Sequence, residues 1–339
     1  MKILYVINDG IVGGLQKHVL CLMEALKGIA ETALIINIKR DSQLIPMFEE
    51  RGLKVYLLDG KSGHDWRIIG RFRKALLDFN PDIIHAHVLP LFCLLYLVFS
   101  CHRIPLIHSL HTSSSKHSFV NWLVWKLLLF RVAYWLPVST STWEGFRKAN
   151  ANMQGEVFFN PILLADYINH GRDSVTWKGE NPVVGMVGRK AKVKDWPSFH
   201  AVEKLVRAKM PDAIFLNAGE EAICDGRAAI ASMDLFIMTS ISEELPTTLL
   251  ECFALGTPVC GFVPKGGTKE ILAFSDGSLR NAFIQERDCK QLAKLVIDLL
   301  NDHERRSAIA ADGMHIVKNH FAAETLVPGR LMDIYAKFT

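Results

Sequence analysis

Short apolar segments alternate with longer segments of helical periodicity along this chain, and this alternation restricts the fold more than any other feature. Segments such as KILYVIN, TALIINI and KVYLL are rich in β-branched residues, and stretches such as WRIIGRFRKALLDF repeat their apolar residues at helical spacing. Strands that are apolar on both faces and alternate with helices form parallel sheets covered on both sides. The sequence therefore predicts an α/β protein with doubly wound parallel sheets.

The alternation begins a second time after a more polar segment without clear periodicity. That segment lies between residues 162 and 180, and PVVGMVG (Pro182–Gly188) opens the second series of strands. A chain of 339 residues suits two domains. We expect one domain over residues 1–162 and another over 163–321. Ligands of open α/β sheets bind beyond the carboxyl ends of the strands, so two facing sheets would form a cleft.

Charge is distributed unevenly between the two halves. Residues 1–160 carry 18 Lys and Arg against 12 Asp and Glu, whereas the remainder carries 21 against 23. The first half is therefore the one expected to meet an anionic surface. No dense basic run with interleaved aromatic residues occurs, which argues against a nucleic acid as partner.

Two segments of the first half bear on membranes. VLPLFCLLYLVFS (Val88–Ser100) is shorter than the ~18 residues that a membrane-spanning helix needs. The stretch Asn121–Trp135 mixes tryptophans with Lys126 and Arg131, and we expect an amphipathic helix there. Such a helix either lies on anionic lipid or packs against the sheet as part of the core.

The seven cysteines indicate a reducing compartment. Their number is odd, their spacings are long, and no C-x-x-C occurs. These features predict free thiols in a cytoplasmic protein, without a disulfide framework or a zinc site. The apolar start KILYVIN is too short for a signal peptide and is expected to form a buried strand.

The stretch SEELPTTLLECFALGTP (Ser242–Pro258) holds two carboxylates eight residues apart. Pro246 suits the first turn of a helix, which should end near Leu255, so Glu243 precedes the helix and Glu251 lies within it. Free backbone N–H groups over Thr247, Thr248, Leu249 and Leu250 can hold a phosphate. The carboxylates would then bind hydroxyl groups on its two sides; alternatively, they only complement the helix dipole.

Two other loops offer groups for an anion. Arg189 and Lys194 follow the first strand of the second half and can neutralise a diphosphate without a metal, unless they are ordinary solvated charges. Gly13 and Gly14 follow the first strand of the chain. They allow close backbone approach at a helix start, or they form a tight turn only.

The chain resembles the family-4 retaining glycosyltransferases, whose fold is GT-B. The resemblance rests on segments in the family's order over nearly the whole chain: NDGIVGGLQKHV, PDIIHAH, LIHSLH, LPVSTST, FFNPI, VGRKAKVKDW, SISEELPTTLLECFALGTPV with its E-x7-E spacing, and PKGGTKEIL. It implies two Rossmann-like domains, an acceptor-side domain first and a nucleotide-sugar domain second. It also implies that a final helix, at about residues 322–339, returns to the first domain.

The resemblance also implies roles for the residues in these motifs. Arg189 and Lys194 would stabilise the diphosphate, Glu243 would bind the donor sugar, Glu251 the ribose, and His111 would lie beside the sugar. Gly13, Gly14 and the Pro246–Leu250 segment would line the donor site.

The other strand histidines are open to simpler explanations. His85 and His108 are expected to be packing residues, whereas the role of His87 stays open. We expect no zinc site from these histidines, because their spacing is not that of a zinc motif.

The chain departs from the family pattern at two places. Gln16 stands where the family usually has an acidic residue, and residues 219–232 are shorter than the segment that usually shapes the pocket for the base. The second departure leaves the nucleotide base undetermined.

The expected function is the transfer of a hexose, with retention, from a nucleotide diphosphate sugar to a hydroxyl of a glycan or lipid-linked acceptor in polysaccharide synthesis. UDP is the expected nucleotide, and neither metal nor other cofactor is required. The alternatives are a nucleotide-sugar epimerase and a non-catalytic GT-B binding subunit. We expect a cytoplasmic protein that contacts the inner face of the membrane if its acceptor is lipid-linked.

Overall fold

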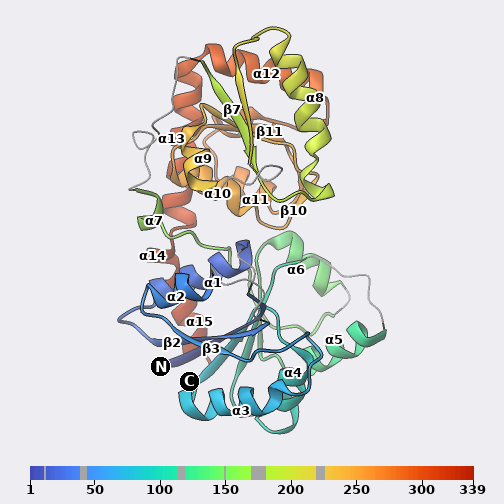
Figure 1. Ribbon diagram of the computed structural model, residues 1–339, viewed down its shortest axis with the longest axis vertical. Coiled ribbons are helices and arrows are strands. Elements are labelled where there is room, and N and C mark those ends of the chain that lie inside the picture. Colours follow the sequence, from blue (N-terminus) through green and yellow to red (C-terminus); the bar gives the residue numbers. More distant parts are fainter. Residues whose placement is uncertain are drawn as a thin grey trace. The chain divides into compact units, whose positions relative to one another are not determined.

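The computed structural model divides the chain into two compact units. The first comprises Met1–Pro161 with Ala323–Thr339, and the second comprises Ile162–Ala322 (Figure 1). The residues that the structure describes are 1–10, 13–38, 44–101, 103–112, 119–148, 150–168, 181–218 and 226–339. The polar segment expected to link the domains falls partly outside them, at residues 169–180, and so does 219–225 of the shortened region.

The first unit contains one six-stranded sheet in the order β3-β2-β1-β4-β5-β6. Every neighbouring pair of strands is parallel. The order reverses between β1 and β4, which is the topological switch point where ligands of such sheets bind. The strands are β1 (Lys2–Asp9), β2 (Glu31–Ile38), β3 (Lys54–Leu57), β4 (Ile83–Ala86), β5 (Leu106–Leu110) and β6 (Tyr134–Pro137).

Helices complete the first unit. One core cluster joins the apolar sides of α3, α4 and α5 to the sheet residues Leu4, Val6 and Ile84. The helices along the chain are α1 (Gly14–Ala25), α2 (Leu44–Glu49), α3 (Ile68–Phe79), α4 (Leu91–Phe99), α5 (Phe119–Arg131) and α6 (Thr140–Arg147).

The C-terminal segment belongs to the first unit and is anchored there by a buried polar chain. It consists of α14 (Ala323–Leu326), a π-helical turn (Val327–Leu331) and α15 (Met332–Ala336). The Tyr335 hydroxyl lies 3.0 Å from the Tyr5 hydroxyl and 2.6 Å from His85 Nδ1, and His85 Nε2 lies 2.9 Å from Ser109 Oγ. His85 is thus a hydrogen-bonded packing residue, as the sequence suggested.

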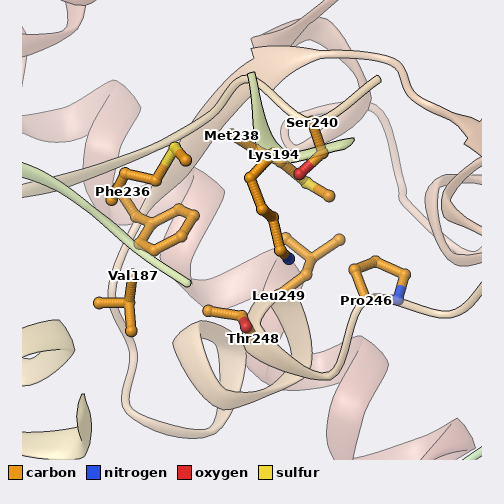
Figure 2. A pocket seen from close by; sticks show the side chains of 9 residues that line it. Val187, Lys194, Phe236, Met238, Ser240, Pro246, Thr248 and Leu249 are labelled. Atoms are coloured by element: carbon orange, nitrogen blue, oxygen red, sulfur yellow. The ribbon is translucent and has the colours of Figure 1, made fainter. Parts of the chain in front are cut away.

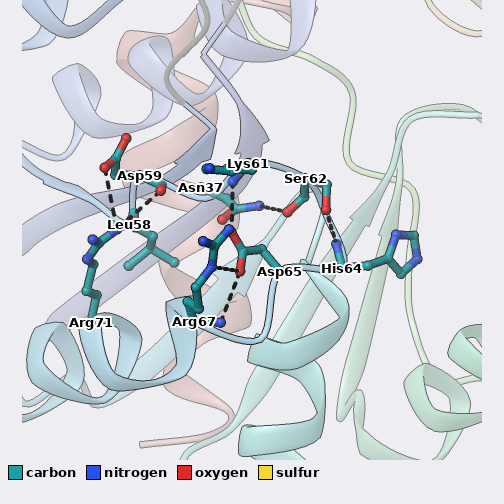
Figure 3. Close-up of polar contacts among 9 residues, drawn as sticks. All are labelled: Asn37, Leu58, Asp59, Lys61, Ser62, His64, Asp65, Arg67 and Arg71. Atoms are coloured by element: carbon teal, nitrogen blue, oxygen red, sulfur yellow. Dashed lines mark hydrogen bonds and ion pairs between the residues drawn. The ribbon is translucent and has the colours of Figure 1, made fainter.

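The loop after β3 is held at the carboxyl edge of the sheet by side chains (Figure 3). The Arg67 side chain donates two hydrogen bonds of 2.8 Å to the buried carboxylate of Asp65, and the backbone N–H groups of Lys61 and Arg67 donate two more, at 3.0 and 3.1 Å. These bonds lower the pKa of Asp65 well below its usual value, and the bonds from the Arg67 side chain make the largest contribution. Asn37, at the end of β2, donates to Ser62 O and to Asn8 Oδ1. The loop is therefore tied to strands β1 and β2.

The prediction of a helix over Asn121–Trp135 is wrong at the C-terminal end of that stretch. The helix ends at Arg131, and Trp135 lies in strand β6 with 2% of its surface exposed. Trp125 of α5 packs on Trp135 with ring centroids 5.3 Å apart, and on Phe146 at 4.8 Å. Helix and strand are both apolar here, so periodicity alone did not separate them.

The second unit contains a five-stranded parallel sheet in the order β13-β11-β9-β7-β8. Counted from β7 this order is 2-1-3-4-5, so the switch point lies between β7 and β9. The strands are β7 (Val183–Val187), β8 (Ile214–Ala218), β9 (Leu235–Met238), β11 (Val259–Phe262) and β13 (Phe283–Ile284). A separate parallel pair joins β10 (Ser242–Glu243) to β12 (Lys265–Gly266).

Most helices of the second unit alternate with its strands, whereas α7 precedes the first strand and the last helices follow one another. They are α7 (Ala165–Ile168), a 3₁₀ turn (Lys192–Lys194), α8 (Trp196–Arg207), α9 (Gly226–Ser232), α10 (Thr247–Ala254), α11 (Thr268–Ala273), a 3₁₀ turn (Arg280–Ala282), α12 (Cys289–Asn301) and α13 (His303–His320). Within the described residues, no helix has both the length and the hydropathy needed to cross a bilayer.

Candidate active site

A lysine and a glutamate meet at the switch point of the second unit. Lys194 ends the loop after β7, Glu243 lies in β10 after β9, and Lys194 Nζ lies 2.7 Å from Glu243 Oε1. Only 15% and 14% of the two side chains are exposed. Both residues were predicted for the donor site from the sequence, and in the structure they form one partly buried ion pair.

The Lys194 side chain crosses a small pocket at the carboxyl ends of β7 and β9 (Figure 2). Val187, Met238 and Leu249 give it apolar walls, whereas Ser240 and Thr248 add hydroxyl groups. The backbone of the lysine is held as well, because Thr239 Oγ1 donates to Lys194 O at 2.9 Å.

The K-G-G segment holds Glu243 in position. The Gly267 N–H donates to Glu243 O at 3.0 Å and to Glu244 O at 3.1 Å. Gly266 has φ +103°, and a Cβ atom there would lie 2.1 Å from Glu243 O. Only glycine therefore permits the close pairing of β10 with β12 that presents Glu243. Glu270, which follows this segment, lies in the first turn of α11.

Helix α10 begins as expected, but the set of free N–H groups is smaller than expected. Pro246 caps the helix, and the N–H groups of Leu249 and Leu250 both donate to Pro246 O, at 3.1 and 3.4 Å. The prediction that these two N–H groups are free is wrong, because the cap carbonyl accepts the first intrahelical bonds. The backbone N–H groups of Thr247 and Thr248 donate to no acceptor in the described part of the chain.

Glu251 occupies a different environment from Glu243. It lies within α10, is 8% exposed, and accepts a hydrogen bond of 3.3 Å from the Tyr167 hydroxyl. Each of the two glutamates therefore has its own neighbours, which suits separate tasks.

Arg189 is an exposed cation at the start of the same loop, two residues after β7. Its guanidinium makes no hydrogen bond or ion pair with the residues that the structure describes, whereas its carbonyl oxygen accepts from Trp196 Nε1 at 3.4 Å. The guanidinium is thus available for an anion.

Sequence reasoning missed Arg287, which connects the loops of this site. It donates to Ser240 O at 3.0 Å and to Thr239 O at 2.6 Å, and it pairs with Asp195, the cap of α8. Partial burial favours the neutral form of Asp195, but bonds from Ser198 and Arg287 outweigh it and lower the pKa of the carboxyl. No local motif marks Arg287, because its hydrogen-bond and ion-pair partners lie 47 or more residues away.

The glycines predicted for the donor site lie at the start of α1 in the first unit. Gly13 caps the helix with an extended backbone, and Gly14 is its first residue. The Gln16 side chain donates to Asp9 O at 2.9 Å. A carboxylate, as in the family pattern, cannot donate this bond, so the departure at Gln16 ties α1 back to β1.

Histidines gather at the switch point of the first unit. His87 follows β4, His111 follows β5, and His87 Nδ1 lies 2.9 Å from His111 Nε2. The His18 ring, on α1, lies 5.1 Å from the His87 ring and 5.3 Å from that of His111. Burial lowers the pKa of His111 to about 3, and burial also holds the pKa values of His18 and His87 well below the usual range.

His18 was not identified from the sequence. His108 was expected to be a satisfied packing residue; its ring does pack, but its buried Nδ1 has no hydrogen-bond partner among the described residues. His18 falls within a helical pattern where a buried histidine gives no signal of its own. The ring of His108 packs on Trp135 at 5.4 Å between centroids.

Both units thus have a parallel α/β sheet with polar groups gathered at the switch point, which is the architecture of GT-B proteins. Two family models match the chain: Glycosyltransferase Family 4 over residues 12–149, and Glycosyl transferases group 1 over residues 225–314. Together they match more than half of its residues, and the chain belongs to the family-4 glycosyltransferases of GT-B type.

A curated relative matches part of the chain. The 2-deoxystreptamine N-acetyl-D-glucosaminyltransferase of Streptomyces fradiae is 27% identical over 172 residues, which are 43% of this chain and 40% of that enzyme. The match thus spans about two fifths of the relative's length.

Solved structures share the fold at low sequence identity. Anabaena HepE, solved with UDP and glucose, has a TM-score of 0.77 at 16% identity, over 99% of this chain and 100% of its own. A glycosyltransferase from Rickettsia africae has a TM-score of 0.75 at 14% identity, over 99% and 98%. A putative UDP-N-acetylglucosamine 2-epimerase from Listeria monocytogenes has a TM-score of 0.65 at 12% identity, over 100% and 96%.

Proposed function

We propose that this protein transfers a hexose from a UDP-sugar to a hydroxyl of a glycan or lipid-linked acceptor in polysaccharide synthesis, with retention at the anomeric carbon. The observation that carries the proposal is the Lys194–Glu243 ion pair at the switch point of the second unit. A cation there meets the charge of the diphosphate, and the adjacent carboxylate accepts hydrogen bonds from sugar hydroxyls. The HepE structures are complexes with UDP and glucose or with UDP-glucose, which supports this donor class.

Charge stabilisation is the main task of the proposed mechanism. As the bond between the anomeric carbon and the diphosphate breaks, negative charge grows on the departing oxygen. Lys194 and the exposed Arg189 stabilise that charge, aided by the N–H groups of Thr247 and Thr248. The acceptor hydroxyl attacks on the face that the diphosphate leaves and gives its proton to the departing phosphate oxygen, so no carboxylate nucleophile is required. The two cations supply the charge without a metal.

The remaining predicted residues bind and orient the donor. Glu243 accepts bonds from the sugar, and Glu251 accepts bonds from the ribose in place of the one from Tyr167. Gly13 and Gly14 allow close backbone approach on the phosphate side, and His111 positions the sugar.

The test compares Glu243→Gln with Glu244→Gln. UDP release from a panel of UDP-sugars is measured with and without candidate acceptors. We expect the Glu243 variant to lose about 10²-fold in kcat/KM, as typical for a group that acts in the transition state. The neighbouring Glu244 variant should stay within about twofold of the wild type.

Other outcomes of this experiment would support one of the alternative functions. Isomerisation of the donor sugar without an acceptor would indicate a nucleotide-sugar epimerase. A lack of binding of any nucleotide sugar by calorimetry would indicate a non-catalytic binding subunit and would overturn the proposal.

A membrane contact is proposed for the first unit, with anionic lipid as the partner. Phe99 of α4 is 75% exposed and Phe130 of the neighbouring α5 is 80% exposed. These rings lie in the half of the chain with excess basic residues. Exposed aromatic rings combined with positive charge are typical of proteins that bind anionic membrane surfaces.

We expect the double variant Phe99→Ser/Phe130→Ser to bind vesicles rich in anionic lipid at least ~10-fold more weakly, because two rings lose their apolar transfer into the interface. Sedimentation of the protein with such vesicles measures this change. Leu205→Ser, at an exposed apolar residue of the second unit, is the control. Equal sedimentation of both variants and the wild type would contradict the proposed contact.

A further inference from the structure

Three histidines from separate elements meet at the switch point of the first unit. His18 comes from α1, His87 follows β4, and His111 follows β5. One ring nitrogen from each lies within 4.8 Å of the others. The three ring centroids are 5.1, 5.3 and 5.2 Å apart, so the imidazoles surround one point almost equally.

Two of these rings have buried nitrogen atoms without partners. His18 is 3% exposed and His87 is 2% exposed. His18 Nδ1 and His87 Nε2 have no hydrogen-bond partner among the described residues. Buried polar atoms of native proteins are almost always paired, so the unpaired His18 Nδ1 indicates a ligand, whereas His87 offers the cation its Nδ1, which faces His111.

The chemistry of the group favours a particular class of ligand. In the described part of the chain the group consists of imidazoles alone. Imidazole nitrogens prefer borderline divalent cations such as Zn²⁺, whereas Mg²⁺ and Ca²⁺ prefer oxygen ligands. Three histidines with a fourth, open position are a common zinc coordination.

We propose, contrary to the expectation from the sequence spacing, that His18, His87 and His111 bind one divalent cation of the Zn²⁺ class. Zinc–nitrogen distances of ~2.0–2.1 Å in a tetrahedral site place ligand nitrogens about 3.4 Å apart. The His87–His111 hydrogen bond of 2.9 Å is replaced by two bonds to the cation. The longest separation, up to 4.8 Å, shortens by about 1.4 Å. Rotation of the side chains provides this movement.

The consequence for activity rests on the proposed transfer. His111 is the residue placed beside the donor sugar, and a cation bound to it withdraws it from that position. Zinc is therefore an inhibitor that acts through the first unit, while the transfer itself proceeds without a metal.

Binding is tested on the full-length protein without any sugar nucleotide. Co²⁺ serves as the probe, because its visible absorption reports tetrahedral coordination, and Zn²⁺ calorimetry gives the affinity. We expect one tight site per chain, and His18→Ala should weaken it by more than the ~10–100-fold that loss of a supporting contact costs. His64→Ala, at an exposed histidine of the same unit, should leave the affinity unchanged. The same affinity in both variants, or no stoichiometric site in the wild type, overturns the proposal.

A second variant tests the assignment of His18 even if the alanine variant does not fold. His18→Cys replaces one nitrogen by a thiolate, so the cobalt complex should be kept and should gain a thiolate-to-cobalt charge-transfer band. A folded His18→Cys protein that binds cobalt without this band contradicts the assignment of His18. Because these readouts involve no donor, a protein that binds cobalt but transfers no sugar refutes the proposed function and not the cation site.

Discussion

Replacing Lys194 by glutamine should lower kcat for sugar transfer by about 10²–10³-fold, as loss of one charge-stabilising donor does in other active sites. The ammonium lies 2.7 Å from Glu243 and is largely shielded from water, so solvent cannot readily replace its charge. The effect should fall mainly on kcat, because charge on the diphosphate grows as the glycosidic bond breaks. Initial rates of UDP release at saturating donor measure the change.

Lys192→Gln is the matched control for this variant. Lys192 lies in the same 3₁₀ turn, two residues earlier, and is exposed. Its substitution should change kcat by less than about threefold, since solvent screens an exposed charge. Equal loss in both variants would show that Lys194 has no special role.

The Lys194→Gln/Glu243→Gln double variant adds a test of the ion pair itself. Groups in direct contact are not additive, so the double variant should lose much less than the product of the single losses. Strictly multiplicative losses would show that the two residues act independently.

Replacing Arg131 by methionine should destabilise the first unit by about 3 kcal/mol. Arg131 is 9% exposed and donates to the backbone oxygens of Leu97, at 3.1 Å, and of Cys101, at 2.9 Å, and to that of Ile104. The Leu97 oxygen lies in the last turn of α4, whose carbonyl groups lack partners within the helix, and the other two oxygens lie in the loop before β5. Methionine keeps the apolar stem but leaves these oxygens unpaired, at ~1–3 kcal/mol for each one that water does not reach.

Differential scanning calorimetry measures this loss. For a unit of this size, 3 kcal/mol corresponds to a decrease of roughly 6–12 °C in the melting temperature. Arg103→Met, at an exposed arginine of the adjacent loop, should shift it by no more than about 2 °C, because surface substitutions usually stay within ~0.5 kcal/mol. If the Arg131 variant melts together with the control, the three backbone oxygens have other partners.

Arg131 also shows a limit of reading charge from sequence. In the sequence it is one of the basic residues of an apolar, tryptophan-rich stretch, and it was a candidate for contact with lipid headgroups. In the structure its guanidinium faces backbone oxygens inside the unit, whereas Phe99 and Phe130 are exposed. The partner of a charged side chain depends on which segments fold against it, and composition does not contain that information.

The start of α10 was predicted more closely, because its signals are local. Pro246 before an apolar helical pattern, and Gly256 with Pro258 after it, define a helix within a residue or two of the observed Thr247–Ala254. The error concerned the N–H groups of Leu249 and Leu250. Their hydrogen bonds to Pro246 O depend on the geometry of the first turn.

The sequence by itself determined the α/β class, the strand–loop positions of Arg189, Lys194 and Glu243, and the family. These follow from short-range periodicity and from motifs that each lie within one loop. Only the tertiary structure decided that Lys194 pairs with Glu243, that Arg287 connects their loops, and that His18 joins His87 and His111. The physical reason is that parallel strands bring their carboxyl ends together through long crossover connections. Which loops become neighbours is set by strand order and packing, which no local spacing records.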